Sequence, residues 1–227
     1  MSFVKKDIVL GAVPFLFLNK YIFTRKAQII TCKNIENDST LWQFDISQFG
    51  TYKDKKIFAD KEPEVRQREI NRVYYHNNKI IVTLSRAIIA LNPETRQLLW
   101  KIDIKEFNPY DIIFNGSIGY VGDGLYYVVI DIENGQKIYE REFDHTLRVN
   151  IEGYSLSYIL YNGLTLYDNY IWFTYGTDGK RFLLKADPRN GNIVDGMLLE
   201  TRLPTHPPQF DENRMYILDQ EGNLYVY

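Results

Sequence analysis

The stretch that decides the fold is "DIENGQKIY", residues 131–139. Two other stretches have the same form, "NPETRQLLW" at residues 92–100 and "DPRNGNIVD" at residues 187–195. In each, Asp or Asn begins a turn, a glycine or its equivalent takes the left-handed conformation, and an apolar or aromatic residue leads the chain into a strand. The recurring phrase therefore predicts one kind of β-turn, used several times.

The strands around this turn also repeat. "NKYIFTRKAQIITCKNIENDSTLWQFDI", which starts at Asn19, aligns with "NKIIVTLSRAIIALNPETRQLLWKIDI", which starts at Asn78. Further copies begin at Gly119 and Tyr170, and a fifth, "RMYILDQEGNLYVY", begins at Arg214 and has two strands. A short Asn, Asp or Gly turn after an apolar stretch precedes each copy, as hairpin connections require. Each unit is thus predicted to be a four-stranded antiparallel meander of about 45 residues, the period of a propeller blade.

These units predict an all-β chain. We expect a single β-propeller domain over residues 1–227, with about five four-stranded antiparallel blades. The fifth unit lacks its outer strand, and an open stack of sheets would leave an unpaired edge. We therefore predict that residues 3–10, a strand-like segment, pair as the outer strand of the last blade and close the ring.

The repeats resemble a known family. The pieces "IIALNPETRQLLW" (residues 88–100), "YVVIDIENGQKIY" (127–139) and "YILDQEGNLYVY" (216–227) are similar to the pyrroloquinoline-quinone-type, or quinoprotein-like, β-propeller repeat. Enzymes of that family have eight blades, an adjacent cysteine pair and calcium ligands, whereas this chain has about five units and one cysteine. The resemblance implies the fold, and it implies neither the quinone nor dehydrogenase activity. We expect no cofactor, as in non-catalytic relatives that serve as assembly scaffolds.

Composition narrows the classes of partner. The chain has 27 basic and 29 acidic residues and a formal net charge of −2, so no strong field attracts nucleic acid or an anionic membrane. The single cysteine, Cys32, cannot form an internal disulfide, which favours a reducing, cytoplasmic compartment and leaves an exported form open. The apolar run at residues 8–18 is too short to span a bilayer. Asp7 and Pro14 are not typical of a signal peptide, so we expect a pair of strands in this N-terminal segment.

The sequence offers little for catalysis. The three histidines, His76, His145 and His206, lack metal-ligand spacing, and no nucleophile elbow, phosphate loop or dinucleotide fingerprint is present. Most Asp and Glu residues occupy turn positions that the repeats explain. We therefore predict a protein that is not an enzyme. Two alternatives remain: a lectin-like or small-ligand binder, and a five-bladed glycoside hydrolase with two carboxylates in the channel.

Aromatic residues recur in the repeats. Trp42 and Trp100 occupy equivalent positions, and Tyr139 occupies the same position in the third unit. Because their placement is periodic, we expect these side chains to pack between neighbouring blades rather than to contact a ligand.

Three connections are longer than the repeat requires, at residues 47–71, 144–155 and 201–209. Each joins an outer strand to the next inner strand, so all three are expected on one face of the ring. Long insertions on one face of a repeat protein are typical of a binding surface. We predict a protein partner there, with the chain as an adaptor, a subunit or an inhibitor or immunity-type protein. The predicted contact residues are Tyr52, Arg66, Arg68, Arg148, Tyr154 and Arg202, of types enriched at interface hot spots.

Overall fold

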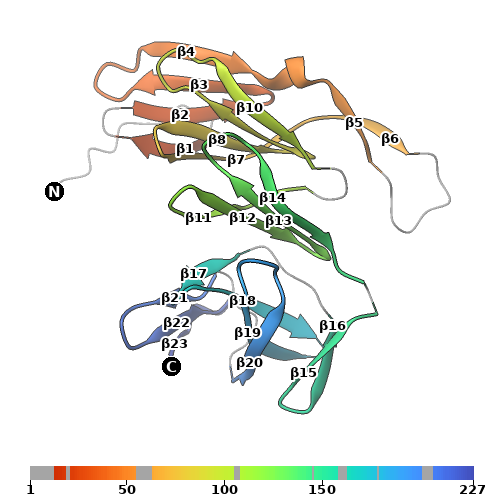
Figure 1. Cartoon of the computed structure of the whole chain (residues 1–227). Coiled ribbons are helices and arrows are strands. Elements are labelled where there is room, and N and C mark those ends of the chain that lie inside the picture. The colour runs from red at the N-terminus through yellow and green to blue at the C-terminus, as the bar shows by residue number, and fades with distance from the viewer. Residues whose placement is uncertain are drawn as a thin grey trace.

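Antiparallel strands form almost all of the regular structure (Figure 1). The computed structural model describes residues 13–18, 21–54, 63–104, 108–144, 146–157, 163–177, 179–200 and 207–227. These residues contain a single short 3₁₀ helix, η1 (Ile46–Phe49), and no α-helix. Accordingly, none of them forms a helix that could cross a membrane. The predicted all-β class with antiparallel sheets is confirmed.

Five sheets are meanders, in which sequential strands are neighbours. The first sheet consists of β1 (Val13–Leu18), β2 (Tyr21–Lys26), β3 (Ile29–Asn34) and β4 (Thr40–Asp45). The second consists of β7 (Ile70–His76), β8 (Lys79–Leu84), β9 (Ala87–Leu91) and β10 (Leu98–Asp103). The third consists of β11 (Ile113–Asn115), β12 (Ile118–Asp123), β13 (Tyr126–Asp131) and β14 (Lys137–Glu142). The fourth consists of β17 (Thr165–Tyr167), β18 (Tyr170–Thr177), β19 (Lys180–Ala186) and β20 (Ile193–Leu199). The fifth has three strands, β21 (Gln209–Phe210), β22 (Met215–Leu218) and β23 (Leu224–Val226).

Two more sheets are isolated hairpins within the long connections. β5 (Thr51–Asp54) pairs with β6 (Glu64–Gln67), and β15 (Arg148–Ile151) pairs with β16 (Tyr154–Ser157). The expectation of five blades alone is therefore wrong, because the described residues form seven sheets. The repeat alignment treated the two connections as irregular, whereas each of them forms backbone hydrogen bonds of its own.

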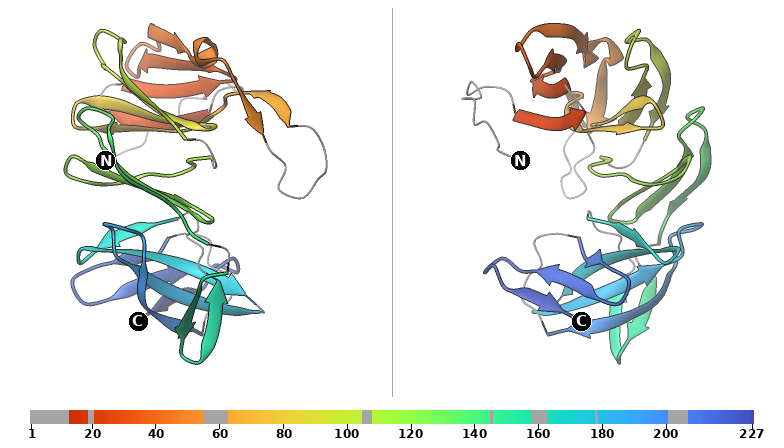
Figure 2. Two further views of the ribbon diagram at one scale, coloured as in Figure 1. Left: turned by 45° about the vertical axis from the view of Figure 1, so that its right-hand side comes forward. Right: turned by 90° about the vertical axis from the view of Figure 1, so that its left-hand side faces the viewer.

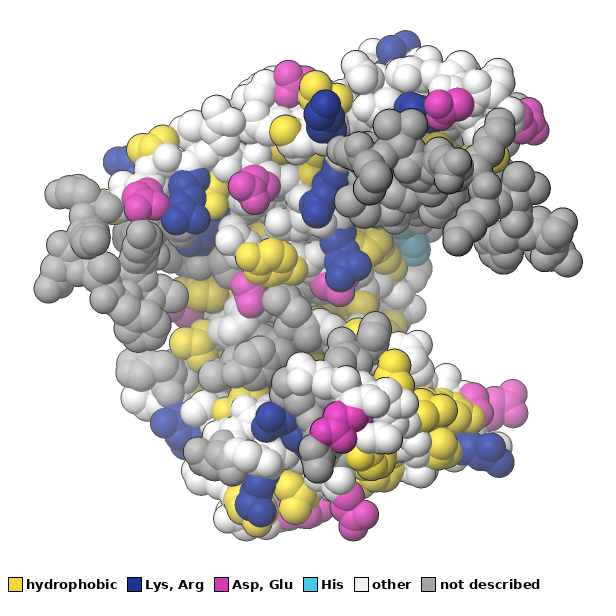
Figure 3. All heavy atoms as spheres, turned by 180° about the vertical axis from the view of Figure 1, so that it is seen from behind, with side chains coloured by type: hydrophobic (Ala, Val, Ile, Leu, Met, Phe, Trp, Pro, Cys, Tyr) yellow, Lys and Arg dark blue, Asp and Glu magenta, His cyan; other side chains and the backbone are white. Residues whose placement is uncertain are grey.

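The expected closed ring is also not observed. The sheets follow one another along an open arc, with the first sheet at one end and the fifth at the other (Figures 1 and 2). Seen from behind, the molecule is hollowed between its upper and lower parts (Figure 3). The fifth sheet leaves an apolar surface uncovered, since Leu224 and Val226 are 60% and 53% exposed. The strand predicted at residues 3–10 lies outside the described residues.

The predicted turn chemistry is confirmed at the third turn of each complete meander. A carboxylate oxygen of Asp131 accepts from the backbone N–H of Glu133 at 2.8 Å, and the Asp131 carbonyl accepts from the N–H of Gly135 at 2.8 Å. Asn92 accepts from the N–H of Glu94 in the same way. In each turn the fifth residue has a positive φ, which glycine adopts without strain. These residues are Asp38 (55°), Arg96 (65°), Gly135 (73°) and Gly191 (69°).

Large aromatic side chains join successive sheets, as the periodic tryptophans predict. Trp100 is 8% exposed, and its indole N–H donates to the carbonyl of Ile132, in the β13–β14 turn of the third sheet, at 3.0 Å. A Cβ at Gly135 would lie 2.6 Å from the Trp100 ring, so the turn glycine makes room for the indole. Trp42 lies edge-on to Phe23 in the apolar cluster that the first two sheets share.

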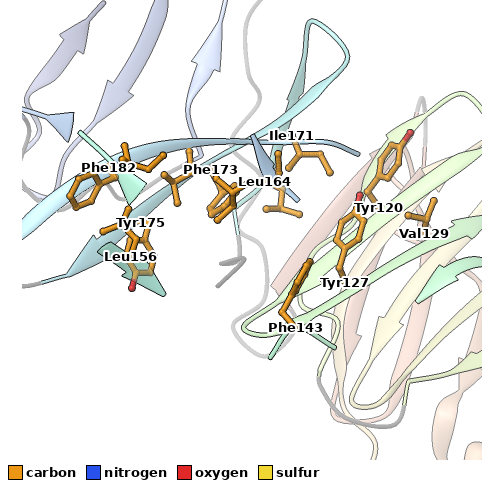
Figure 4. Packing of buried hydrophobic residues seen from close by; sticks show 14 residues of the cluster. Tyr120, Tyr127, Val129, Phe143, Leu156, Leu164, Ile171, Phe173, Tyr175 and Phe182 are labelled. Atoms are coloured by element: carbon orange, nitrogen blue, oxygen red, sulfur yellow. The ribbon is translucent and has the colours of Figure 1, made fainter. Parts of the chain in front are cut away.

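Tyr139 also packs at a junction between sheets, because it is partly buried against the cluster that the third and fourth sheets share, but a second aromatic residue is buried more deeply. Tyr127, one strand further in, is fully buried there, and its hydroxyl donates to the carbonyl of Pro188 at 2.6 Å. Gly191 lies against the Tyr127 ring as Gly135 lies against Trp100. Figure 4 shows this cluster, with Tyr127 on one side and Phe173 of the fourth sheet on the other. Tyr139 is half-buried beside Tyr127, with ring centres 6.5 Å apart.

Replacing Trp100 with Ala should lower the free energy of unfolding by about 3–5 kcal/mol, the usual cost of removing a large buried aromatic side chain. Trp100→Phe also loses the hydrogen bond to Ile132, but it should cost less than the Ala variant because it retains a ring against Gly135. Urea unfolding followed by circular dichroism measures both. An Ala variant as stable as the parent protein would show that Trp100 does not join the second and third sheets.

Candidate functional site: the connection face

One end of the meanders carries both hairpins. In an antiparallel meander, the turn between the second and third strands lies at the same end as the link from the fourth strand to the next sheet. The β5–β6 and β15–β16 hairpins therefore share this end with the β2–β3, β8–β9, β12–β13 and β18–β19 turns, and we call these elements together the connection face. In Figure 1 both hairpins project toward the right-hand side of the arc, β5–β6 from its upper part and β15–β16 from its lower part.

The β5–β6 hairpin brings two predicted contact residues together. Tyr52 pairs directly with Arg66 across the two strands. The Arg66 guanidinium forms an ion pair with Glu64 at 2.9 Å, and Val65 is 65% exposed. The guanidinium carbon of Arg86, in the β8–β9 turn, lies 6.0 Å from the centre of the Tyr52 ring. This hairpin therefore displays an arginine and an apolar side chain beside a tyrosine that contacts a cation.

The β15–β16 hairpin places the other two described candidates. Tyr154 packs edge-on against Phe182, with ring centres 5.5 Å apart. The Lys180 ammonium, at the start of β19, lies 5.0 Å from the centre of the Tyr154 ring. Arg148 is exposed at the first position of β15, and its guanidinium donates to the carbonyl of Leu147 at 2.9 Å.

Both hairpins share one arrangement. Each sets a tyrosine against a cation near the second turn of a meander, Tyr52 with Arg86 and Tyr154 with Lys180. A cation over an aromatic face contributes about 0.5–1 kcal/mol at an exposed site and holds the ring in one orientation. Sequence reasoning selected the tyrosines and missed both cations. No local motif marks Arg86 or Lys180, because each lies in the repeat that follows its hairpin.

Arg68 occupies a different environment from the other candidates. Its side chain is buried, and it donates to the carbonyl of Ser85 at 2.8 Å, to the carbonyl of Phe49 at 3.3 Å and to the carboxylate of Asp103 at 2.9 Å. These hydrogen bonds hold the first connection against the second sheet. Because each guanidinium nitrogen of Arg68 already donates one, little of the side chain can contact a partner in this conformation. Arg202, the sixth candidate, lies outside the described residues.

The structure describes one of the three histidines. His76 lies at the opposite end of the meanders, where its ring stacks on Phe114 at 4.2 Å and its Nε2 is 2.6 Å from the carbonyl oxygen of Gly116. His145 and His206 fall in segments that the structure does not describe. Within the part that it describes, no three His, Cys, Asp or Glu side chains are grouped so that they could hold a metal ion.

One carboxylate near the connection face has an unusual protonation equilibrium. Burial raises the pKa of Asp123, at the end of β12, to about 6, because a low-dielectric environment disfavours the charged form. The positive charge of Arg86 and a hydrogen bond from the backbone of Asn108 act in the opposite direction and limit the rise. Near neutral pH Asp123 is therefore mostly ionised in an environment that disfavours its charged form.

Comparisons with known proteins identify a fold and no family. No protein-family model and no curated protein matches the chain. Among solved structures, the computationally designed Ika8 protein has a TM-score of 0.53 and 15% identity, over 95% of this chain and 70% of that one. The computationally designed Ika4 protein has a TM-score of 0.48 and 18% identity, over 71% of this chain and 92% of that one. At this identity, the likeness to Ika8 concerns the arrangement of strands alone.

The raised pKa of Asp123 predicts a pH dependence of stability. Between an ordinary carboxyl pKa of 3.8 and the folded value of about 6, the folded protein retains a proton that the unfolded chain releases. The stabilisation from this proton is complete below pH 4 and is lost as the pH rises through 6. Asp123→Asn should therefore melt at a higher temperature than the parent protein at pH 7.5, and the difference should shrink toward pH 4.

Thermal melts at several pH values from 4 to 7.5 test this expectation. Glu94→Gln, at an exposed turn on the opposite end, is the control for the loss of one negative charge. A difference between Asp123→Asn and the parent protein that does not change with pH would contradict a raised pKa.

Proposed function

We propose that the chain is a non-enzymatic repeat protein of the β-propeller type that binds a protein partner through the connection face. The partner role is that of an adaptor, a subunit or an inhibitor. The five meanders are its blades, an assignment that the resemblance of their sequence repeats to the pyrroloquinoline-quinone-type unit supports. A cytoplasmic location, expected from the single cysteine, belongs to the same proposal.

The observation that carries the proposal is the pair of hairpins with their tyrosine–cation contacts. All four residues of β6 are exposed, so this strand buries almost nothing in the core. Arginine and tyrosine, which this hairpin presents together, are among the residue types enriched at protein-binding hot spots. Blade packing does not require these groups, and a partner surface would use them.

The β15–β16 hairpin supports the same function by a different construction. Ile151 and Leu156 are buried in the cluster that also contains Phe182, so one side of the hairpin is fixed to the fourth sheet. Arg148 is exposed on this fixed support, with Tyr154 half-buried nearby. A fixed support lowers the entropic cost of binding, because fewer groups have to be ordered when the partner arrives.

The proposal is tested by capturing a partner from the native cell with the tagged chain and then measuring its affinity for purified variants. Tyr52→Ala, Arg66→Ala and Arg148→Ala remove groups from the connection face. At least one of them should cost about 2 kcal/mol of binding free energy, roughly a 30-fold loss of affinity. Because the net charge is near zero, binding should weaken only modestly between low and physiological salt.

Arg96→Ala is the matched control, since Arg96 is exposed at the opposite end of the meanders. Its affinity for the partner should equal that of the parent protein. Loss of binding in Arg96→Ala with normal binding in the three connection-face variants would place the interface on the other end. Capture of a glycan in place of a protein would support the lectin-like alternative.

A further inference from the structure

We propose that the outer edge of β23 pairs with the same strand of a second copy of this chain, so that two molecules share one continuous antiparallel sheet. This inference goes beyond the proposed function, because it concerns the side of the last sheet and not the connection face. β23 lies in the sheet at the C-terminal end of the arc (Figures 1 and 2), and within the described residues it has a neighbouring strand on one side only. The four-stranded meanders have a fourth strand at the place beside β23 that the fifth sheet leaves open.

The backbone of β23 has hydrogen-bonding groups that point away from its own sheet. Met215 and Tyr227 exchange two hydrogen bonds, in which the N–H of each donates to the carbonyl of the other at 3.0 Å. Successive residues of an antiparallel strand direct these groups to opposite sides. The N–H and C=O groups of Leu224 and Val226 therefore point outward, where a further strand can pair with them.

The outer strands of the other four meanders are protected against such pairing. In β4, β10, β14 and β20 the register shifts at one point, where the outer strand has one residue more than the strand beside it, that is, a β-bulge. Each of these strands also contains at least one charged side chain. Bulges and charges are two of the features by which sheets avoid edge-to-edge pairing. The bulge residues are exposed apolar side chains, namely Leu41, Leu99, Ile138 and Val194.

β23 has neither of these two features. Its pairing with β22 is regular from Leu224 to Val226, and its three residues include no charged side chain. Leu224 and Val226 are 60% and 53% exposed, and they lie on the same face of the sheet because they are two residues apart. A regular, uncharged edge of this kind can act as a template for another strand.

A second copy of β23 fits this edge because the edge is complementary to itself. In an antiparallel pair with Tyr225 on the two-fold axis, Leu224 of each copy lies opposite Val226 of the other. Both residues direct their backbone groups outward, so each such pair can exchange two hydrogen bonds. The side chains meet as apolar cross-strand pairs, and no like charges lie opposite one another in this register.

The small area of the edge sets the strength of the interaction. Stable, specific protein interfaces bury about 1,200–2,000 Å² in total, and a pair of three-residue strands covers less than that. We therefore expect a weak, reversible dimer that forms as the protein concentration rises.

Sedimentation velocity of the full-length protein over a wide range of concentrations tests the inference. The average mass should rise from that of one chain toward that of two. Leu224→Lys and Val226→Glu should each weaken association about tenfold, because each removes an apolar pair twice in the symmetric dimer. An equimolar mixture of the two variants should recover association, since the introduced Lys of one chain then faces the introduced Glu of the other.

Val194→Glu is the matched control, because Val194 has the same exposed fraction, 53%, and lies at the bulge of β20. This variant should associate as the parent protein does. A protein that stays monomeric at every concentration would overturn the inference, and so would equal weakening by Val194→Glu and Val226→Glu. A mixture of the two β23 variants that associates no better than either alone would contradict the register. Association that appears only after removal of residues 1–10 would assign the edge to that segment and overturn the inference for the full chain.

Discussion

The two central junctions between sheets depend on one kind of contact, an aromatic ring of one sheet packed against the turn glycine of the next. A four-stranded meander has an apolar face that it cannot cover by itself, so it becomes stable only when a neighbouring sheet covers that face. Trp100 spans the second and third sheets through its hydrogen bond to Ile132, and Tyr127 spans the third and fourth through Pro188. The recurring turn thus has two roles, because it reverses the chain and it provides a flat surface for a ring.

The need to pack against a neighbouring sheet constrains the residues on the stacked faces of the meanders. It leaves the residues at the ends of the meanders free to vary. The chain departs from its repeat in the links between sheets, where length and composition do not disturb the stacking. Tyr52 and Tyr154 lie in such links, and each contacts a cation from the sheet that follows. Rigid sheets that position variable connections are a common way for a repeat fold to present a binding surface.

Much of the fold could be predicted from the sequence, because turn residues and alternating apolar positions are local signals. The meanders, their third turns and the buried tryptophans follow from such signals. The β15–β16 hairpin was missed although its turn, Glu152–Gly153, has a positive φ at both residues, 48° and 83°, since "EG" is a weaker hairpin signal than "NG". Closure of a ring depends on how many sheets stack and at what angle, which no local pattern specifies. The burial of Arg68 could not be predicted either, because nothing in the sequence distinguishes a buried arginine from an exposed one.

Native-state hydrogen–deuterium exchange tests most directly the central claim that stacked sheets form the stable core while the first hairpin is an addition to it. The account predicts slow exchange in β8, β9, β12, β13, β18 and β19, and slow exchange in β15–β16, which is anchored through Ile151 and Leu156. It predicts fast exchange in β5–β6, because all four residues of β6 are exposed. Protection of β5–β6 equal to that of β8 and β9 would contradict the account, because the hairpin would then belong to the core.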